Sequence, residues 1–367
     1  MDNRYQIIEY HREPKQTLEF LELPLRLYSG NEGWIPPSQD EVKSFLDGSH
    51  PFHSFLRHQS FLIVSSGRTI GRATAFINQA LTVDGEPVGS IGFFECEEDD
   101  KAAVLLIDKA CEWLKAQGIG LVWAPMNGTI WSSYRFMIKG FGDIPFVKEP
   151  YNQPYYPAFF ERAGFEVFKR WSTRTFSGAA TDELMNRLGK IYPHLLQKGY
   201  RFRQLMMDEF DQELSILYEL VFDAYSDLNG YHKITPAIFQ EVFRNLKEIL
   251  LPEFAYFALD PQGNPVGFHL MVPTYSPNVR STMENTASHH LKIQSMVTLH
   301  LGITHEEVKK NNGLGGALLY VGFSAAQKRQ VPIRGALAVE NSPSTVFLNY
   351  ATEDPHEYCL YDKKLTG

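Results

Sequence analysis

Apolar residues recur along the chain with two different spacings, which predict short strands alternating with amphipathic helices. Residues 61–77 and 254–272 are each an apolar run, a turn with glycine and a second apolar run, which predicts two β-hairpins. Residues 102–118 and 315–330 carry apolar side chains three or four positions apart, which predicts two long helices. An apolar run at 295–303 predicts a buried strand before the second helix. The pattern therefore indicates a mixed α/β fold, with a central sheet flanked by helices.

The elements follow the same order in the two halves, which indicates an internal repeat. The segment "LELPLRLYSGNEGW" at 21–34 aligns with "YELVFDAYSDLNGY" at 218–231 at a constant offset, since 219−22, 225−28 and 230−33 all give 197. Each half reads strand, helix, helix, hairpin, strand, helix, strand, short helix, strand. We therefore expect one domain over 1–176, a connecting helix over 177–199 and a second domain over 200–367.

Charge and cysteine content narrow the function classes. The chain has 367 residues, a formal net charge of −8 and a pI of about 5.9, and no dense Lys/Arg block, which argues against a nucleic-acid partner. Its three cysteines form no CxxC pair, so we expect neither a disulfide framework nor a structural zinc site. The sequence has no secretory signal and no apolar run long enough to span a membrane. We expect a soluble cytoplasmic protein without a membrane or metal partner.

A glycine-rich turn opens the second long helix, in "VKKNNGLGGALLYVGFSAA" at 308–326. A helix N-terminus presents unpaired N–H groups and a partial positive charge, and glycine lets an anion approach them closely. The turn therefore suits a phosphate or pyrophosphate. An ordinary strand-to-helix loop stays an open alternative. The spacing matches neither a P-loop nor a dinucleotide fingerprint.

Several motifs together resemble the GNAT acyltransferase superfamily. Residues 310–315, "KNNGLG", resemble its [R/Q]-x-x-G-x-[G/A] signature, with lysine in the place of arginine or glutamine. The segment "GALAVENSPSTVFLNYA" at 335–351 resembles its strand, asparagine and short-helix ending, and 151–168 resembles the ending "FYEKLGF" in the first half. The resemblance implies two tandem GNAT-like folds. The [R/Q]-x-x-G-x-[G/A]-like signature occurs only in the second of them.

The resemblance also implies how acetyl-CoA, or another acyl-CoA, is bound as co-substrate. Its pantetheine arm is expected between two parallel strands that splay apart, at 296–303 and 333–339. Backbone groups of Leu301, Gly302 and Ile303 are expected to pair with the pantetheine amides. The remaining expected cofactor-binding residues are those of the turn and the asparagine after the strand: Lys310, Asn311, Asn312, Gly313, Leu314, Gly315, Gly316 and Asn341.

The first half is not expected to bind the co-substrate. Its equivalent strand-to-helix junction, "FFECEEDDKAA" at 93–103, carries five acidic residues. Acids stabilise a helix N-terminus but repel a pyrophosphate, so we expect a self-capped helix there. A long segment rich in aromatic and polar residues follows at 124–156. It lines a cavity or packs as a loop, and both interpretations stay open.

Acyl transfer to an amine needs a base for the amine proton and an acid for the leaving thiolate. Glu284 and His300 are the candidate bases, and Tyr350 is the candidate acid, because Leu348 occupies the position where the family often has tyrosine. A structural role stays open for each of the three.

These observations lead to one preferred function and two alternatives. The preferred function is a CoA-dependent N-acyltransferase, acetyl being the expected acyl group, that acts on a small-molecule amine of unknown identity. The alternatives are a non-catalytic protein that binds CoA or an acyl ligand, and an aminoacyl transferase of the Fem type. The sequence leaves open whether the protein forms a homodimer.

Overall fold

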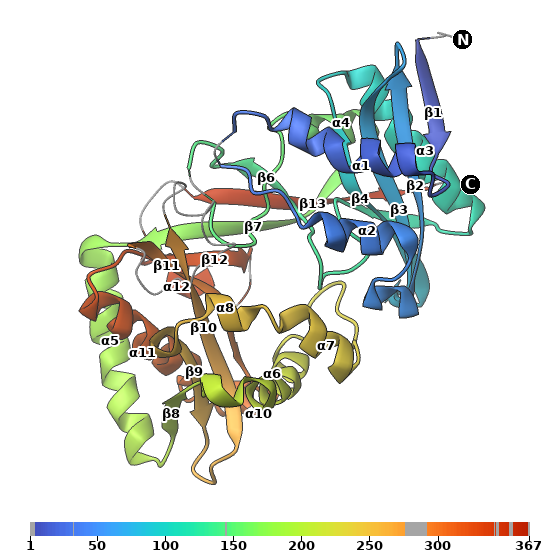
Figure 1. The fold of residues 1–367 in the computed structure, drawn as a ribbon. Helices are drawn as coiled ribbons and strands as arrows, with labels where there is room; N and C mark the ends of the chain where they lie inside the picture. Colours follow the sequence, from blue (N-terminus) through green and yellow to red (C-terminus); the bar gives the residue numbers. More distant parts are fainter. Residues whose placement is uncertain are drawn as a thin grey trace. The chain divides into compact units, whose positions relative to one another are not determined.

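The computed structural model describes residues 4–31, 33–143, 145–275, 292–340, 342, 345–351 and 355–365. The chain divides into two compact units (Figure 1). Unit 1 consists of Met1–Asp143, Pro150–Arg170 and Glu357–Gly367, and unit 2 of Ile144–Glu149 and Trp171–His356.

Unit 1 is built on a mixed sheet whose strands run in the order β1-β2-β3-β4-β5-β13-β7, with β6 pairing β13. Every pair for which a register is defined is antiparallel except β4 with β5. The strands are β1 Tyr5–Glu9, β2 Leu56–Ser65, β3 Arg68–Val83, β4 Glu86–Cys96, β5 Leu121–Ala124, β6 Phe136–Lys139, β7 Glu166–Phe176 and β13 His356–Lys364. The helices are α1 Pro14–Leu27, α2 Gln39–Asp47, the 3₁₀ turn η1 Pro51–Ser54, α3 Asp100–Ala116 and α4 Tyr156–Arg162.

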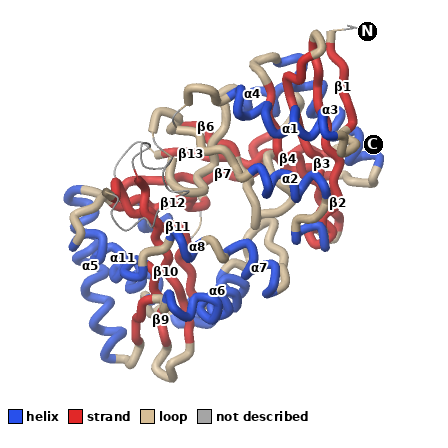
Figure 2. Tube along the Cα trace, viewed as in Figure 1, coloured by secondary structure: helices blue, strands red, loops and turns tan. Residues whose placement is uncertain are grey.

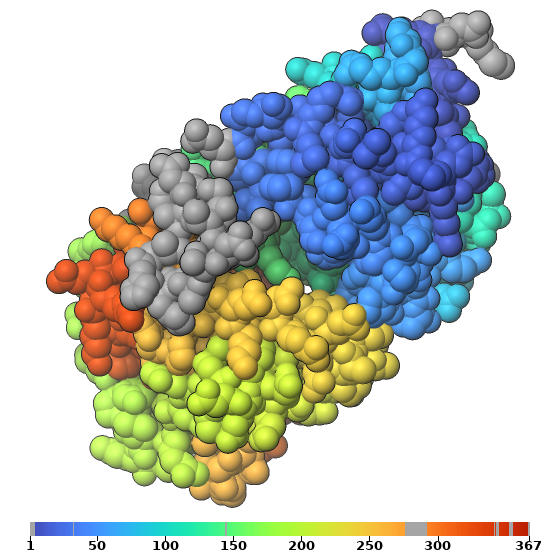
Figure 3. All heavy atoms as spheres, viewed as in Figure 1, coloured from blue at the N-terminus to red at the C-terminus, as the bar shows by residue number. Residues whose placement is uncertain are grey.

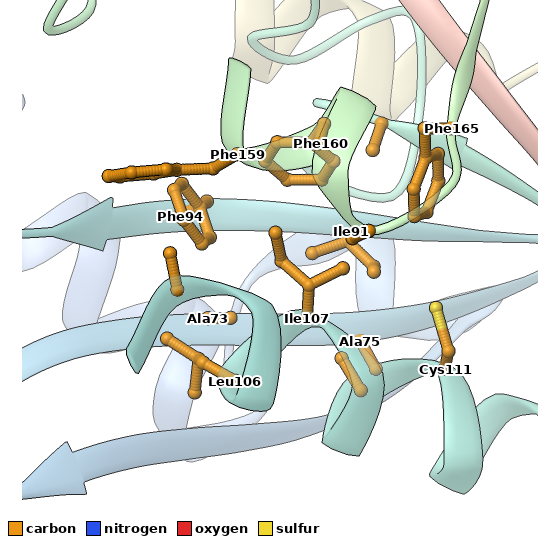
Figure 4. Close-up of a cluster of buried hydrophobic side chains, with 14 of the residues drawn as sticks. Ala73, Ala75, Ile91, Phe94, Leu106, Ile107, Cys111, Phe159, Phe160 and Phe165 are labelled. Atoms are coloured by element: carbon orange, nitrogen blue, oxygen red, sulfur yellow. The ribbon is translucent and has the colours of Figure 1, made fainter. Parts of the chain in front are cut away.

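The main core of unit 1 lies between its sheet and helix α3. Leu106 and Ile107 of α3 are fully buried and belong to one cluster with Ala73 and Ala75 of β3 (Figure 4). The small alanine side chains let the helix lie close to the sheet. Phe94 extends the cluster toward α4, because its ring meets that of Phe160 edge to face at 4.9 Å.

Unit 2 repeats this plan, with strands in the order β7-β12-β11-β10-β9-β8 and only β11 and β12 parallel. Its strands are β8 Arg201–Gln204, β9 Ala255–Leu259, β10 Pro265–Tyr275, β11 Ile293–Ile303 and β12 Ile333–Val339. Its helices are α5 Gly178–Gln197, η2 Met207–Glu209, α6 Phe210–Ala224, α7 Pro236–Phe243, α8 Leu246–Ile249, η3 Pro252–Phe254, α10 His305–Lys310, α11 Leu314–Lys328 and α12 Thr345–Leu348. Helices α5 and α11 lie side by side (Figure 2).

Helices α6 and α11 cover opposite faces of the unit 2 sheet. A Cβ built on Gly267 would lie 2.9 Å from Leu318 of α11, whereas one built on Gly302 would lie 3.0 Å from Ala224 of α6. Both glycines therefore let a helix lie close to the sheet. The space-filling view shows residues of α6 and α7, in yellow-green and gold, on the surface of unit 2 (Figure 3).

Most predicted elements are present at the predicted positions. The hairpins are β2-β3 and β9-β10, and the long helices are α3 and α11, within two residues of the predicted starts and ends. The expected connecting helix is α5. One prediction missed an element: the turn before α11 contains the short helix α10, which places the glycines at a junction between two helices.

The compact units do not follow the linear boundaries expected at 176 and 200, because the halves exchange their last strands. Strand β7 ends the first series of elements, yet its residues Trp171–Phe176 pair with β12 in unit 2. Strand β13 ends the second series and pairs with β5 and β6 in unit 1. The linear boundaries remain a prediction about the sequence repeat.

Neighbouring leucines on α3 provide a test of the unit 1 core. Leu106 is fully buried, whereas Leu105 is 38% exposed. We expect Leu106→Ala to lower the free energy of unfolding by about 2–5 kcal/mol, because it leaves a cavity, and Leu105→Ala to lower it by less than about 1 kcal/mol. Urea unfolding followed by circular dichroism measures both. Equal effects would contradict the packing described here.

Candidate functional site

The two parallel strands of unit 2 share only a short stretch of pairing. Met296, Val297 and Thr298 of β11 pair with Ile333, Arg334 and Gly335 of β12, and the pairing ends there. Just beyond, both strands carry an irregularity. In β11 the register with β10 shifts, so that Leu299 is an extra residue without a partner in β10. In β12 the register with β7 shifts at residues 336–337. Such bulges bend strands and end pairing. We call the opening between 299–303 and 336–339 the strand slot.

The residues of β11 and β12 become more exposed at the point where the strand slot begins. Residues 295–297 of β11 and Ile333 of β12 are buried, whereas 298–303 and 334–339 are half-buried throughout. Beyond Thr298, β11 is paired only with β10 in the described part of the sheet. Its other backbone edge therefore faces the strand slot, as the resemblance implies for a pantetheine arm.

A buried histidine fixes the closed end of the strand slot on the α11 face. His269 contacts the Leu318 carbonyl through Nδ1 at 3.0 Å and Thr298 Oγ1 through Nε2 at 3.1 Å. Burial lowers the pKa of His269 to about 4, so the ring is neutral at physiological pH. This neutral bridge joins β10, the last paired residue of β11 and helix α11.

The glycine turn at the N-terminus of α11 has a defined geometry. Asn311 and Gly313 adopt left-handed φ values of 46° and 82°, and the Asn312 side chain accepts a hydrogen bond from the Leu314 N–H at 3.1 Å. The N–H groups of Gly315 and Gly316 lie in the first turn, where an α-helix offers no acceptor of its own.

The three glycines of this turn meet different surroundings. Side chains added at Gly313 and Gly316 would come within 3 Å of Ile191 and Leu188 of α5. A side chain at Gly315 would meet nothing within 4 Å. Side chains at Gly313 or Gly316 would therefore crowd α5, and the open side of the turn is at Gly315.

A buried carboxylate holds the glycine turn in place through hydrogen bonds. Glu307 is 1% exposed and accepts hydrogen bonds from Lys310 Nζ at 2.7 Å, Asn312 Nδ2 at 2.8 Å and Tyr200 Oη at 2.9 Å. Burial alone would raise the pKa of Glu307, but these hydrogen bonds outweigh it and lower the pKa. Two carboxylates balance the charge of Lys310: that of Glu307 and that of Glu306, whose Oε1 lies 3.2 Å from Lys310 Nζ. The role of Lys310 toward a phosphate remains a prediction.

Of the candidate residues for proton transfer, the structure describes His300 and Tyr350, and it places them on opposite faces of the unit 2 sheet. His300 lies next to Leu301, whose side chain packs on the α11 side, so strand alternation directs His300 to the α6 face. There its ring lies 6.3 Å from that of Tyr225, whose hydroxyl donates to the Leu301 carbonyl at 3.3 Å. Tyr350 packs on the α11 side, and its hydroxyl contacts Arg187 of α5. Glu284 and Asn341 lie outside the described residues.

Three ionisable residues at the closed end of the strand slot were not singled out from the sequence. Arg334 of β12 contacts His356, which in turn contacts Glu149. One signal was available, since Arg334 is a charged residue inside the otherwise apolar strand "IRGALAV". The partnership with Glu149 could not be anticipated, because 207 positions separate it from His356.

The equivalent place in unit 1 is closed by the chain itself. Strands β4 and β5 also share three pairs, ending at Ser90 and Trp123. Beyond them, Met126 N–H donates to the Ile91 carbonyl at 2.8 Å, and Phe93 N–H donates to Asn127 Oδ1 at 2.8 Å. These contacts occupy the strand edge that, among the described residues, has no partner strand in unit 2.

The acidic junction of unit 1 is self-capped, as predicted. The Asp99 side chain accepts from the Ala102 N–H at 3.1 Å and from the Tyr5 hydroxyl at 2.6 Å. Asp100 pairs with Arg162 at 2.7 Å. The N-terminus of α3 is therefore capped by the chain's own carboxylate, and a second carboxylate lies in its first turn.

Two features are absent from the described part of the chain. It contains no helix with the length and apolarity needed to cross a bilayer. It also contains no group of three or more His, Cys, Asp and Glu side chains placed to hold a metal ion. The cysteines Cys96, Cys111 and Cys359 are free and buried.

Comparison with characterised proteins gives two relatives by sequence. No family model matches the chain. It is 26% identical over 275 residues to a bacterial ceramide synthase of Caulobacter vibrioides, which spans 74% of this chain and 70% of that protein. It is also 26% identical over 247 residues to protein YghO of Escherichia coli, which spans 65% of this chain and 61% of that protein.

Comparison of structures shows the fold. A tandem GNAT protein from the clavulanic acid biosynthesis pathway superposes with a TM-score of 0.52 and 11% identity, covering 99% of both chains. A GCN5-related N-acetyltransferase of Sphaerobacter thermophilus gives a TM-score of 0.51 at 13% identity, covering 98% of this chain and 96% of that one. The predicted fold is therefore confirmed: the chain has the tandem GNAT fold.

An ion pair beside the strand slot predicts a pH-dependent contribution to stability. His305 contacts Asp223 at 3.1 Å and Asp227 at 2.9 Å, and these hydrogen bonds raise its pKa. A raised folded-state pKa stabilises the fold below the unfolded pKa of about 6.5, and the effect is lost as pH rises through the folded pKa. We expect His305→Gln to lower the melting temperature more at about pH 5.5 than at about pH 9. Equal losses at both pH values would contradict this ion pair.

Proposed function

On the tandem GNAT fold and the site geometry, we propose that this protein is an acyl-CoA-dependent N-acyltransferase whose second half binds the acyl-CoA. The observation that carries the proposal is the contrast between the two halves. The strand slot of unit 2 keeps a backbone edge beside an accessible helix N-terminus, whereas Met126 and Asn127 fill the equivalent place in unit 1.

The proposed binding mode uses backbone groups. Pantetheine amides pair with the edge of β11 at Leu301, Gly302 and Ile303, as an added strand pairs with a sheet edge. The diphosphate rests on the N–H groups of the turn from Asn311 to Gly316, where the helix dipole favours negative charge. Gly315 provides the closest approach, because no side chain lies within 4 Å of the position of its missing Cβ.

We propose a fatty acyl group in place of the acetyl group that the resemblance implies, and a long-chain amine as its acceptor. The support is the relative that is a bacterial ceramide synthase, since a ceramide is the amide of a fatty acid and a long-chain amino alcohol. The reaction itself is the same for both acyl groups: an amine displaces CoA from a thioester.

One observation favours a second candidate, a protein that binds acyl-CoA without turning it over. The hydroxyl of Tyr350 contacts Arg187, and His300 lies on the opposite face of the sheet. These two residues therefore do not form an acid–base pair across one substrate. A turnover assay separates the two candidates.

Substitutions at Gly315 test the binding mode without disturbing the fold, because the position is helical and open. We expect Gly315→Glu to weaken binding of palmitoyl-CoA by about 10-fold or more, because its carboxylate repels the diphosphate. The matched neutral variant Gly315→Gln should bind within about 3-fold of wild type, a difference below about 0.7 kcal/mol. Isothermal titration calorimetry measures both. Unchanged binding in the Glu variant would exclude this placement of the diphosphate.

Release of free thiol from palmitoyl-CoA and acetyl-CoA, with a panel of short and long-chain amines, measures turnover. We expect release that depends on the amine and is faster with palmitoyl-CoA and a long-chain amine. Binding without release from either thioester would favour the binding protein. Faster release with acetyl-CoA would restore the acetyl group of the sequence prediction.

A further inference from the structure

A cluster of three polar side chains lies at the closed end of the strand slot. Glu149 Oε1 lies 2.6 Å from His356 Nδ1, and Arg334 Nη2 lies 3.0 Å from His356 Nε2 and 3.1 Å from Nδ1. The second oxygen of Glu149 accepts from the Phe146 N–H at 2.8 Å, and the Arg334 guanidinium lies 5.8 Å from the Phe146 ring centre. All four residues belong to unit 2.

The position of Arg334 follows from the strand register. It pairs with Val297, one pair before Thr298 and Gly335, where the strand slot begins. Its neighbour Ile333 packs in the core on the α11 side, so Arg334 projects from the opposite face. Arg334 and His300 therefore emerge on the same face of the sheet, at and just beyond the closed end of the strand slot.

The contacts hold Arg334 in place. Glu149 lies against Nδ1 of His356, and Arg334 Nη2 lies within 3.1 Å of both ring nitrogens. Glu149 therefore orients the His356 ring, and the ring in turn holds the guanidinium. The Glu149 side chain is 0% exposed and that of His356 is 3% exposed, so packing fixes both.

Arg334 also has a hydrogen-bond donor, its buried Nε–H, that no described residue accepts. Buried polar groups are almost always paired, and exceptions are often found where a ligand or a reacting group supplies the partner. An N–H at this place can serve an oxygen at the closed end of the strand slot.

We propose that Arg334 stabilises the oxyanion of the acyl-transfer reaction, with His356 and Glu149 as its positioning residues; this rests on the proposed function. The amine nitrogen attacks the thioester carbonyl carbon, and the C=O π electrons move to the oxygen, which Arg334 binds. The oxyanion then reforms the carbonyl as the C–S bond breaks, the nitrogen loses a proton and the sulfur gains one. The products are an amide and CoA thiol, and no other reactant is needed.

Substitution of Arg334 tests the catalytic part of the proposal. We expect Arg334→Met to lower kcat by about 100-fold or more, as removal of an oxyanion donor does, with the Kd for palmitoyl-CoA within about 3-fold. Guanidinium at millimolar concentration should restore part of the rate. Arg334→Lys, which keeps the charge but loses the planar fork, should retain an intermediate rate.

Arg329→Met is the matched control. Arg329 belongs to the same unit, pairs with the carboxylate of Glu253 and lies 5.9 Å from the Phe254 ring centre. It follows the last turn of α11, at the end of the helix away from the glycine turn, and its side chain is exposed. We expect its kcat to stay within about 2-fold of wild type. A loss equal to that of Arg334→Met would show a general effect of removing such an arginine and overturn the proposal.

A double-mutant cycle tests the positioning residues. We expect Glu149→Gln and His356→Gln each to lower kcat by about 10-fold in the wild-type background and to have no further effect on kcat in Arg334→Met. A merely structural role would give the same loss in both backgrounds and overturn this part. Melting curves of every variant show that the compared proteins are folded.

The results distinguish the inference from the proposed function. A kcat of Arg334→Met within about 3-fold of wild type, in a wild-type protein that turns over acyl-CoA, overturns the inference alone. Binding of palmitoyl-CoA without any turnover by the wild type overturns both.

Discussion

The separation of two parallel strands after three residue pairs is the constraint on which the rest of the site depends. Strands β11 and β12 pair from Met296 to Thr298 and then bulge apart, so that the polar backbone edge of β11 has no neighbouring strand in the described part of unit 2. A backbone edge of this kind is costly to bury and useful to expose only where another chain or an extended ligand pairs with it. His269 holds the separation in place by joining Thr298 to helix α11, which also presents the glycine turn.

The two halves use one plan for different purposes. In unit 1 the corresponding edge is paired with Met126 and Asn127, and the start of α3 is capped by Asp99. In unit 2 the start of α11 has no acidic residue in its first turn. The buried carboxylate of Glu307, in the preceding helix α10, accepts hydrogen bonds from Lys310, Asn312 and Tyr200. The two equivalent helix ends therefore differ in charge, and this difference supports the proposal that the second half binds the acyl-CoA. The relative placement of acidic residues, rather than net charge, carries this information.

Much of the fold could be predicted from the sequence, and less of the site. Periodicity located α3, α11 and both hairpins, because amphipathic spacing depends only on neighbouring residues. A self-capped start of α3 could also be predicted, because five acidic residues surround it; the structure identifies Asp99 as the capping residue. The strand exchange of β7 and β13 could not be predicted, since pairing partners far apart in sequence leave no local pattern. The Glu149–His356 contact depends on the same long-range arrangement, and the segment 124–156 that contains Glu149 showed only that it was unusually long and polar.

The exchange of β7 and β13 sets an order for folding during synthesis. Strand β13 pairs with β5 and β6 of unit 1, yet it leaves the ribosome after every strand of unit 2 has been made. The sheet of unit 1 therefore stays incomplete until the end of the chain has been synthesised. Until then its unpaired strand edges can associate with other chains. The two halves of the sequence are consequently not independent modules that evolution or an experimenter can separate by cutting the chain once.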